Sequence, residues 1–260
     1  MQKSQQPEAV SSILKVFNIL NLLSEQKEIG VSELSQRLMM SKATTYRFLQ
    51  TLKTLGYVGQ DDEWDKYYLT LRLFELASKS LEYTDLVSIA DKEMRSISEK
   101  TSEALHLGIL DESVIIYIHK IDSDYNLRMQ SRIGRQNPLY STGIGKVLMS
   151  GRDETYIREV LKDVKFVKHT DKTLENVEQF LTELERVRDL HYAEDNEEQE
   201  SGLRCIAAPI YDRLGYIVAG LSISLPSIRF DEKRKSYYVG LLQTAGKNIS
   251  KELGYHEYPI

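Results

Sequence analysis

The segment from Ser41 to Gly56 carries hydrogen-bond donors on one arc of a helical wheel and contains no carboxylate. At about 100° per residue, the apolar arc holds Thr45, Phe48, Leu49, Leu52 and Leu55, and the opposite arc holds Tyr46, Arg47, Gln50, Lys53 and Thr54. Arginine and glutamine side chains match base edges in the major groove, and lysine and hydroxyl groups match phosphates. This pattern predicts a helix that enters a DNA groove.

The residues expected to contact DNA are Ser32, Ser41, Lys42, Thr44, Tyr46, Arg47, Gln50 and Lys53. Ser32 and Ser41 are predicted helix N-caps, which bring helix amides close to phosphates. Lys42 suits a phosphate contact, and Arg47 suits guanine O6 and N7. The alternative is a solvated surface helix in which Arg47 is an ordinary ion-pair partner.

A second group of polar residues lies in the C-terminal two thirds of the chain. The sequence Ser141-Thr142-Gly143-Ile144-Gly145 precedes a predicted helix, so Ser141 and the amides of Gly143 and Ile144 could hold a carboxylate. Ser222 and Ser224 project to the same face of a predicted strand. Arg128 is a further candidate charge partner, and an exposed strand arginine is an equal alternative. An ordinary capped helix is the alternative for Ser141 to Gly145.

The acid-rich run from Glu194 to Glu200 resembles paired catalytic carboxylates or a hard-cation site. Most charge runs are solvated loops, and we expect a loop for every member except Asp195. Cys205 lies in an apolar strand pattern, where a buried structural thiol is the default. No histidine is paired with Cys205 by a motif, although His106 and His119 on adjacent strands could flank a ligand or a metal. We therefore predict no catalytic residue, no metal and no cofactor.

Composition limits the class of protein. The 260 residues are 41% hydrophobic and 28% charged, which excludes disorder as the dominant state. A signal peptide and a membrane-spanning run are missing, so we expect a cytoplasmic protein. The single cysteine cannot form an internal disulfide or a thiolate cluster. The net charge is −5, but residues 31–58 contain four basic residues against Glu33 alone, so the basic excess is local.

Periodicity and turn residues predict two domains of an α+β protein. Helices at 10–24, 31–38 and 42–55 with strands at 57–60 and 66–70 make a winged helix-turn-helix at 10–70. A linker helix follows at 71–84. Residues 85–260 then form an effector-binding domain with an antiparallel sheet. Within it we expect helices near 85–100, 143–150, 153–162, 175–190 and 231–253, and strand-like runs at 103–110, 113–121 and 203–224.

Several of these segments resemble the IclR family of bacterial regulators. The motifs are Ser41-Lys42-Ala43-Thr44-Thr45-Tyr46-Arg47-Phe48-Leu49, Tyr140-Ser141-Thr142-Gly143-Ile144-Gly145-Lys146, Asp195 to Glu198, and Gly202-Leu203-Arg204-Cys205-Ile206-Ala207-Ala208-Pro209. The resemblance implies a dimer or tetramer whose C-terminal domains have a GAF-like fold and bind a small acid. It also implies that Asp195 and Cys205 line the pocket.

Two features depart from the family pattern. His191 stands where the family usually has Gly four residues before the acidic position, and the wing turn is acidic, with Asp61, Asp62, Glu63 and Asp65. Only Lys66 could support wing contact with phosphates. The run from Arg135 to Thr142 and the terminal Gly254-Tyr255-His256 are similar to family members that repress pectin and hexuronate catabolism and respond to 2-keto-3-deoxygluconate.

Together, the residues and the resemblance favour a ligand-responsive transcription regulator, most simply a repressor that binds a partly palindromic operator as a homo-oligomer. Two alternatives stay open. One is a keto-acid enzyme whose N-terminal module only dimerises, which would show chemical turnover. The other is a DNA-associated redox sensor that acts through Cys205.

Overall fold

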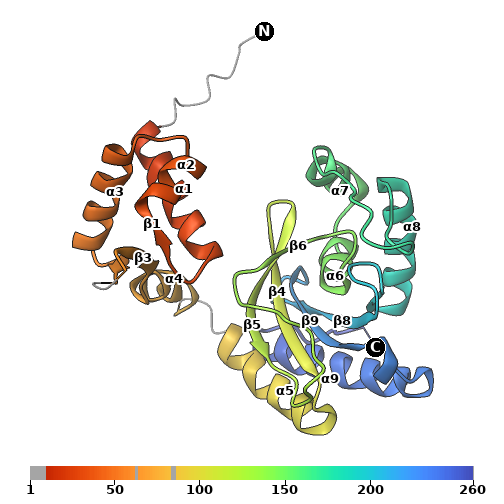
Figure 1. Cartoon of the computed structure of the whole chain (residues 1–260). Helices are drawn as coiled ribbons and strands as arrows, with labels where there is room; N and C mark the ends of the chain where they lie inside the picture. Colours follow the sequence, from red (N-terminus) through yellow and green to blue (C-terminus); the bar gives the residue numbers. More distant parts are fainter. Residues whose placement is uncertain (1–9, 62–63, 83–85, 260) are drawn as a thin grey trace. The chain divides into compact units, whose positions relative to one another are not determined.

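Figure 1 shows a computed structural model of the chain, which describes residues 10–61, 64–82 and 86–259. The chain divides into two units, residues 1–84 and residues 85–260. In the described part of the chain, no helix combines the length and the hydropathy needed to cross a bilayer.

The N-terminal unit is a winged helix-turn-helix, as predicted. Its helices are α1 (Ser11–Glu25), α2 (Val31–Arg37), α3 (Lys42–Thr54) and α4 (Arg72–Glu82). Strands β1 (Ile29–Gly30), β2 (Val58–Gln60) and β3 (Lys66–Leu69) form an antiparallel sheet in the order β1-β3-β2. The sequence did not predict β1, because two residues carry no detectable period. The buried core comprises Ile19, Leu23, Ile29, Leu34, Leu49, Leu52, Val58 and Tyr67.

The predicted serine N-cap is present at the start of α3 but not at the start of α2. Ser41 caps α3 as predicted, since its Oγ accepts a hydrogen bond from the amide of Thr44. Gly56, with φ +82°, ends the same helix. The prediction that Ser32 caps α2 is wrong. Gly30 is the N-cap, and Ser32 lies inside the helix because α2 begins directly after β1.

Helix α1 buries a narrower stripe than its sequence suggests. Ile19 and Leu23 are buried, whereas the apolar side chains nearer the start of the helix are more than half exposed in the single chain. The exposed residues are Val10, Ile13, Leu14 and Phe17. Leu55, placed on the apolar arc of α3, is also 52% exposed, because the helix ends there and turns away from the core.

The C-terminal unit is built on a six-stranded antiparallel sheet in the order β6-β5-β4-β9-β8-β7. The strands are β4 (Ala104–Asp111), β5 (Val114–Ile121), β6 (Gln136–Pro138), β7 (Ala193–Asn196), β8 (Leu203–Tyr211) and β9 (Ile217–Pro226). This confirms the expected α+β class. Strands β6 and β7 were not predicted, since β6 is short and β7 lies inside the acid-rich run.

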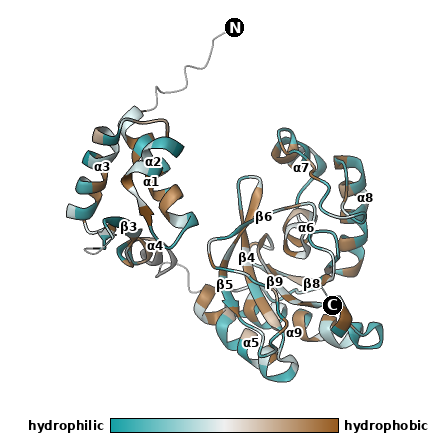
Figure 2. Ribbon diagram, in the orientation of Figure 1, coloured by the Kyte–Doolittle hydropathy of each residue, from teal (hydrophilic) through white to brown (hydrophobic). Residues whose placement is uncertain are grey.

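Helices cover both faces of this sheet (Figure 1). Helices α5 (Leu86–Thr101) and α9 (Lys235–Glu252) pack on one face, and α6 (Gly143–Ser150), α7 (Glu154–Leu161) and α8 (Val177–Leu190) lie on the other. Figure 2 shows hydrophilic and hydrophobic sides on the covering helices, as expected for a three-layer domain. Gly145 allows α6 to approach the backbone of Leu139, because a Cβ atom there would lie 2.3 Å from the Leu139 carbonyl oxygen.

Candidate functional site

The exposed side of α3 presents two cations to solvent. Lys42 and Arg47 are exposed, and their side chains make no hydrogen bond or ion pair with any described residue. Tyr46, between them on the wheel, is 50% exposed. Thr44 is partly buried, and its hydroxyl accepts a hydrogen bond from Ser41 Oγ. The geometry therefore leaves Lys42, Tyr46 and Arg47 available to an incoming partner.

Gln50 and Lys53, which the sequence places on the same donor arc, are engaged by the wing hairpin. Gln50 Nε2 donates to the hydroxyl of Tyr67 at 3.2 Å, and Lys53 Nζ donates to Gln60 Oε1 at 2.8 Å. Both contacts must break or be shared before these side chains reach a duplex. On the donor arc of α3, Lys42, Tyr46 and Arg47 are therefore available, whereas Gln50 and Lys53 are hydrogen-bonded to strands β3 and β2.

The wing offers little positive charge. Lys66, its one basic residue, pairs with Glu28 at 2.8 Å, which raises the pKa of the lysine. The Lys66 charge is thus already neutralised by a neighbour. Trp64 stands 65% exposed in the same turn.

A polar cavity lies in the C-terminal unit, between the start of α6 and strands β7, β8 and β9. Its lining includes Gly143, Ile144, Asp195, Cys205 and Ser222, all expected from the sequence. The cavity volume is only about 10 Å³, room for at most about one water molecule. Five expected residues are thus brought together, in a closed arrangement.

Asp195 is the buried acid of this cavity, only 2% exposed. Its Oδ1 accepts hydrogen bonds from the amides of Glu198 (2.7 Å) and Gln199 (3.3 Å). Burial nevertheless raises the pKa of Asp195 to about 7, because desolvation outweighs these bonds. At neutral pH the carboxyl is partly protonated, which lessens its repulsion of an acidic ligand and lets it donate a hydrogen bond.

The start of α6 is capped from within. Thr142 Oγ1 accepts from the amide of Gly145, and Ser141 Oγ donates to Gln199 Oε1. Ser141 is fully buried and is not in the cavity lining. Gln199, which accepts the hydrogen bond of the Ser141 hydroxyl, does line the cavity. Gln199 was not predicted as a site residue, because it stands in the acid-rich run that was expected to be a solvated loop.

Two expected site residues lie elsewhere. Ser224 is not in the lining, and its hydroxyl lies 3.3 Å from His106 Nδ1. Arg128 is exposed in the connection after β5, where it donates to the carbonyl of Ser123. Arg128 is therefore not the exposed strand arginine of the alternative interpretation, because β5 ends at Ile121. Arg135, which sequence reasoning did not select, is the cation that lines the cavity.

His106 and His119 do not share a site. His106 contacts Ser131 and Ser224 and stacks on Tyr117, whereas His119 bonds Asp91 of α5 at 2.8 Å. The two rings point to opposite faces of the sheet, since His119 pairs in register with Leu107 rather than His106.

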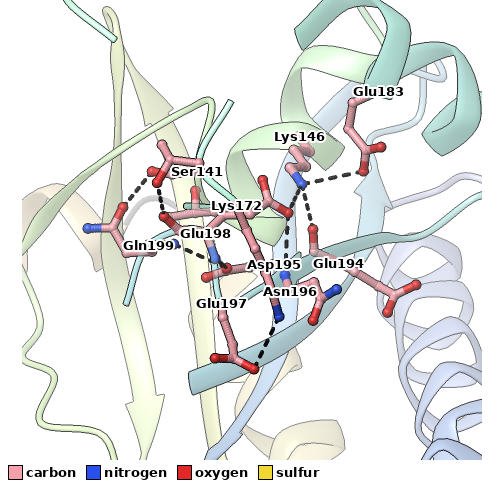
Figure 3. A network of polar contacts seen from close by, with 12 residues as sticks. Ser141, Lys146, Lys172, Glu183, Glu194, Asp195, Asn196, Glu197, Glu198 and Gln199 are labelled. Atoms are coloured by element: carbon pink, nitrogen blue, oxygen red, sulfur yellow. Dashed lines mark hydrogen bonds and ion pairs between the residues drawn. The ribbon is translucent and has the colours of Figure 1, made fainter. Parts of the chain in front are cut away.

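Lys146, on α6, binds two members of the acid-rich run, Glu194 and Glu198 (Figure 3). Its ammonium group, 1% exposed, donates to Glu198 Oε1 at 2.6 Å and to the Glu194 carbonyl at 2.7 Å, with Glu183 Oε1 at 3.4 Å. Glu194 and Glu198 are buried, so the solvated-loop prediction is wrong for both. The sequence analysis did not predict this ion pair, although the lone lysine inside the apolar sequence Gly-Ile-Gly-Lys-Val-Leu-Met is a signal that could have indicated it.

The environment of Cys205 bears on the redox alternative. Burial raises the pKa of the Cys205 thiol well above its usual range, and the nearby Asp195 carboxylate adds to the shift. Because the thiolate is the reactive form, this environment lowers the reactivity of the cysteine.

Comparison with known proteins identifies the class. A family model described as the IclR helix-turn-helix domain matches residues 12–62, and one described as the bacterial transcriptional regulator IclR C-terminal matches residues 78–251. With the fold above, these matches show that the chain belongs to the IclR family of DNA-binding transcriptional regulators.

Particular relatives are similar over almost the whole chain. The HTH-type transcriptional regulator KdgR of Escherichia coli K12 is 57% identical, covering 98% of this chain and 97% of its own length. KdgR of Dickeya chrysanthemi is 58% identical over 98% of this chain and 84% of its own length. Among solved structures, Thermotoga maritima IclR aligns with a TM-score of 0.80 at 33% identity, covering 94% of this chain and 99% of that one. The C-terminal domain of E. coli KdgR aligns at 50% identity with a TM-score of 0.62, covering 66% and 100%.

Proposed function

We propose that this regulator is a repressor of sugar-acid catabolism genes that a small keto sugar acid releases from its operator. The closed cavity around Asp195 carries the proposal. A site of about 10 Å³ cannot hold a sugar acid, so binding must accompany movement of the cavity walls. A ligand that binds only the opened arrangement shifts the population toward it, whereas equal affinity for both would shift nothing.

In the DNA-bound state, α3 lies in the major groove. Arg47 reads a guanine, Lys42 and the capped start of α3 contact phosphates, and Tyr46 borders the same surface. Gln50 and Lys53 join after exchanging their hairpin partners for DNA. Their present bonds keep both side chains ordered near this surface.

The protein acts as a homo-oligomer on a partly palindromic operator. The exposed apolar residues of α1 support this, since contiguous apolar surface on a soluble unit marks an interaction site. Two copies of α3 would then meet two half-sites about one helical turn apart.

In the cavity, the amides of Gly143 and Ile144 bind the effector carboxylate with Arg135 as its counter-charge. Asp195 and Ser222 bind its hydroxyl or keto oxygens, and Cys205 packs against its carbon chain. Ser141 contributes once the ligand displaces Gln199. We propose the 2-keto-3-deoxygluconate class, on the resemblance described above and the similarity to KdgR.

The test is fluorescence anisotropy with duplexes selected from a random pool, at about 150 mM salt, because polyanion affinity varies steeply with salt. Adding 2-keto-3-deoxygluconate is expected to release the selected duplex, and gluconate, which lacks the keto group, serves as the matched control. Absence of any sequence preference would refute the DNA-binding assignment. Unchanged binding with every sugar acid tested would refute the effector assignment.

A further inference from the structure

The cavity around Asp195 is lined by packed helices and strands and by two irregular connections. The β7–β8 connection, with Gln199 and Glu200, is fixed by hydrogen bonds to Asp195 and Ser141. Helix α6 and strands β8 and β9 belong to the buried cores of the domain. Met129 and Arg135 also line the cavity, but they come from residues 122–135, the irregular connection between β5 and β6, here called the entrance segment. Irregular surface segments open at lower free energy than packed strands and helices.

The two ends of the entrance segment are anchored. At the first end, Ser123 Oγ donates to the Ser102 carbonyl at 2.7 Å, and Arg229 Nη1 donates to the Leu127 carbonyl at 2.8 Å. At the other end, the Gly134 amide donates to the Tyr117 carbonyl at 2.7 Å, and Gly134 has φ +80°. Residues 129–133 lie between these anchors.

In the middle of the segment, Met129 packs against the buried core, and Ser131 makes hydrogen bonds to strands of the sheet. Ser131 Oγ lies 2.7 Å from His106 Nε2, and the Ser131 carbonyl accepts from Lys120 Nζ at 2.7 Å. His106 is fully buried and stacks on Tyr117, which is itself a cavity wall. Burial lowers the pKa of His106 to about 4, so the ring is neutral at pH 7 and supplies one donor and one acceptor. The Ser131–His106 bond thus connects the segment, through the His106 ring, to Tyr117 in the cavity wall.

On its outer side the entrance segment forms a cationic groove of about 790 Å³. The charged residues lining it are Lys120, Arg128, Arg132 and Arg135 against Asp122. Asp122 is already paired with Lys120. The Arg132 side chain is exposed and makes no hydrogen bond or ion pair with any described residue. Arg135 and Met129 line both this groove and the closed cavity, so the two spaces share a wall.

We propose that the outer groove is a docking site for small organic anions and that the entrance segment, opening at the Ser131–His106 bond, admits the anion past Arg135 and Met129 into the cavity. The groove is large enough for a sugar acid and has the opposite charge. The inner cavity is polar and too small until the segment moves. The identity of the anion rests on the proposed function, but the route does not.

Cys205 provides a test that needs no effector. It is the only cysteine in the chain and lines the inner cavity. Cys205 is partly exposed, so its labelling by methanethiosulfonate reagents reports how easily a reagent reaches the cavity, and Cys205→Ser gives the background. The raised pKa of the thiol slows every reagent alike, so ratios between reagents are unaffected.

Ser131→Ala removes the hydroxyl that bonds His106. We expect Cys205 labelling to accelerate about threefold to tenfold, the range expected for one hydrogen bond, while Ser131→Thr keeps a hydroxyl and a near wild-type rate. Circular dichroism checks that each variant is folded. An unchanged labelling rate in folded Ser131→Ala would overturn the proposed opening.

Arg132→Glu reverses one charge of the groove without breaking a described contact. At about 10 mM ionic strength, we expect a sulfonate-bearing reagent to label Cys205 several-fold more slowly and a trimethylammonium-bearing reagent to label it faster. Arg213→Glu is the matched control, since Arg213 is exposed in the turn at the far end of β8. Equal reagent ratios in the two variants would overturn the docking site, whether or not the protein responds to a sugar acid.

Discussion

Replacing Asp195 with asparagine is expected to stabilise the protein above neutral pH and to have little effect near pH 4. The folded protein keeps the Asp195 proton up to about pH 7, whereas the carboxyl of an unfolded chain releases it near pH 4. The folded state therefore binds more protons in this window, and stability falls as pH rises through it. A shift of about three units corresponds to about 4 kcal/mol at pH 8, as an upper limit.

Asparagine does not ionise, so the variant does not lose this stability as the pH rises, and it can keep the local geometry. Its Oδ1 can accept the same bonds from the amides of Glu198 and Gln199 that Asp195 accepts now. The charged groups that act on Asp195 are Glu198, which raises its pKa, and Lys146, which lowers it. Both remain in the variant, so the difference from wild type isolates the titration of Asp195.

The measurement is urea unfolding at pH values from 5 to 8, followed by circular dichroism. Trp64, the only tryptophan, lies in the N-terminal unit, so its fluorescence would report the other unit. Between pH 5 and pH 8 the free energy of unfolding of the variant should rise relative to wild type by at most about 2.5 kcal/mol, because part of the full difference already exists at pH 5. Glu252→Gln, at an exposed position at the end of α9, controls for the loss of one carboxylate. A pH-independent difference for Asp195→Asn would refute the reasoning.

Four further substitutions, one of them also combined with a compensating change, test other contacts. Lys146→Met should destabilise the protein by about 3 to 5 kcal/mol, because it leaves the Glu198 carboxylate buried and unpaired, and adding Glu198→Gln should recover part of that loss in calorimetry. His191→Gly should stabilise the end of α8 by about 1 kcal/mol, since His191 adopts φ +55°; an unchanged or lower melting temperature would contradict this. Arg47→Ala should cost about 1 to 3 kcal/mol in specific binding and relax the preference at one base pair, whereas Lys42→Ala should weaken all duplexes alike and lower the salt slope by about one; a binding-site selection that retains every base preference in Arg47→Ala would exclude the reading role.

Local sequence was enough for the elements that have a clear period and a clear end. The helix at α3 begins after a serine whose side chain caps it and ends at a glycine with positive φ, and both signals are local. The predicted helix at 143–150 coincides with α6, which also begins after a residue whose side chain caps it, Thr142. Strands β1 and β6 escaped prediction because two or three residues show no period, and their pairing partners lie far away in the chain.

The sequence by itself determined the winged helix-turn-helix and the polar face of α3, because helical periodicity and capping act within a few residues. The class of protein followed from the resemblance of its motifs to the IclR family. Only the tertiary structure decided which polar groups are free. It assigned Gln50 and Lys53 to the hairpin and placed Arg135 rather than Arg128 in the cavity lining. It also buried Glu194 and Glu198 against Lys146. Burial and ion pairing depend on side chains that meet across the sheet, up to 52 residues apart in the chain, and no local pattern encodes such distances.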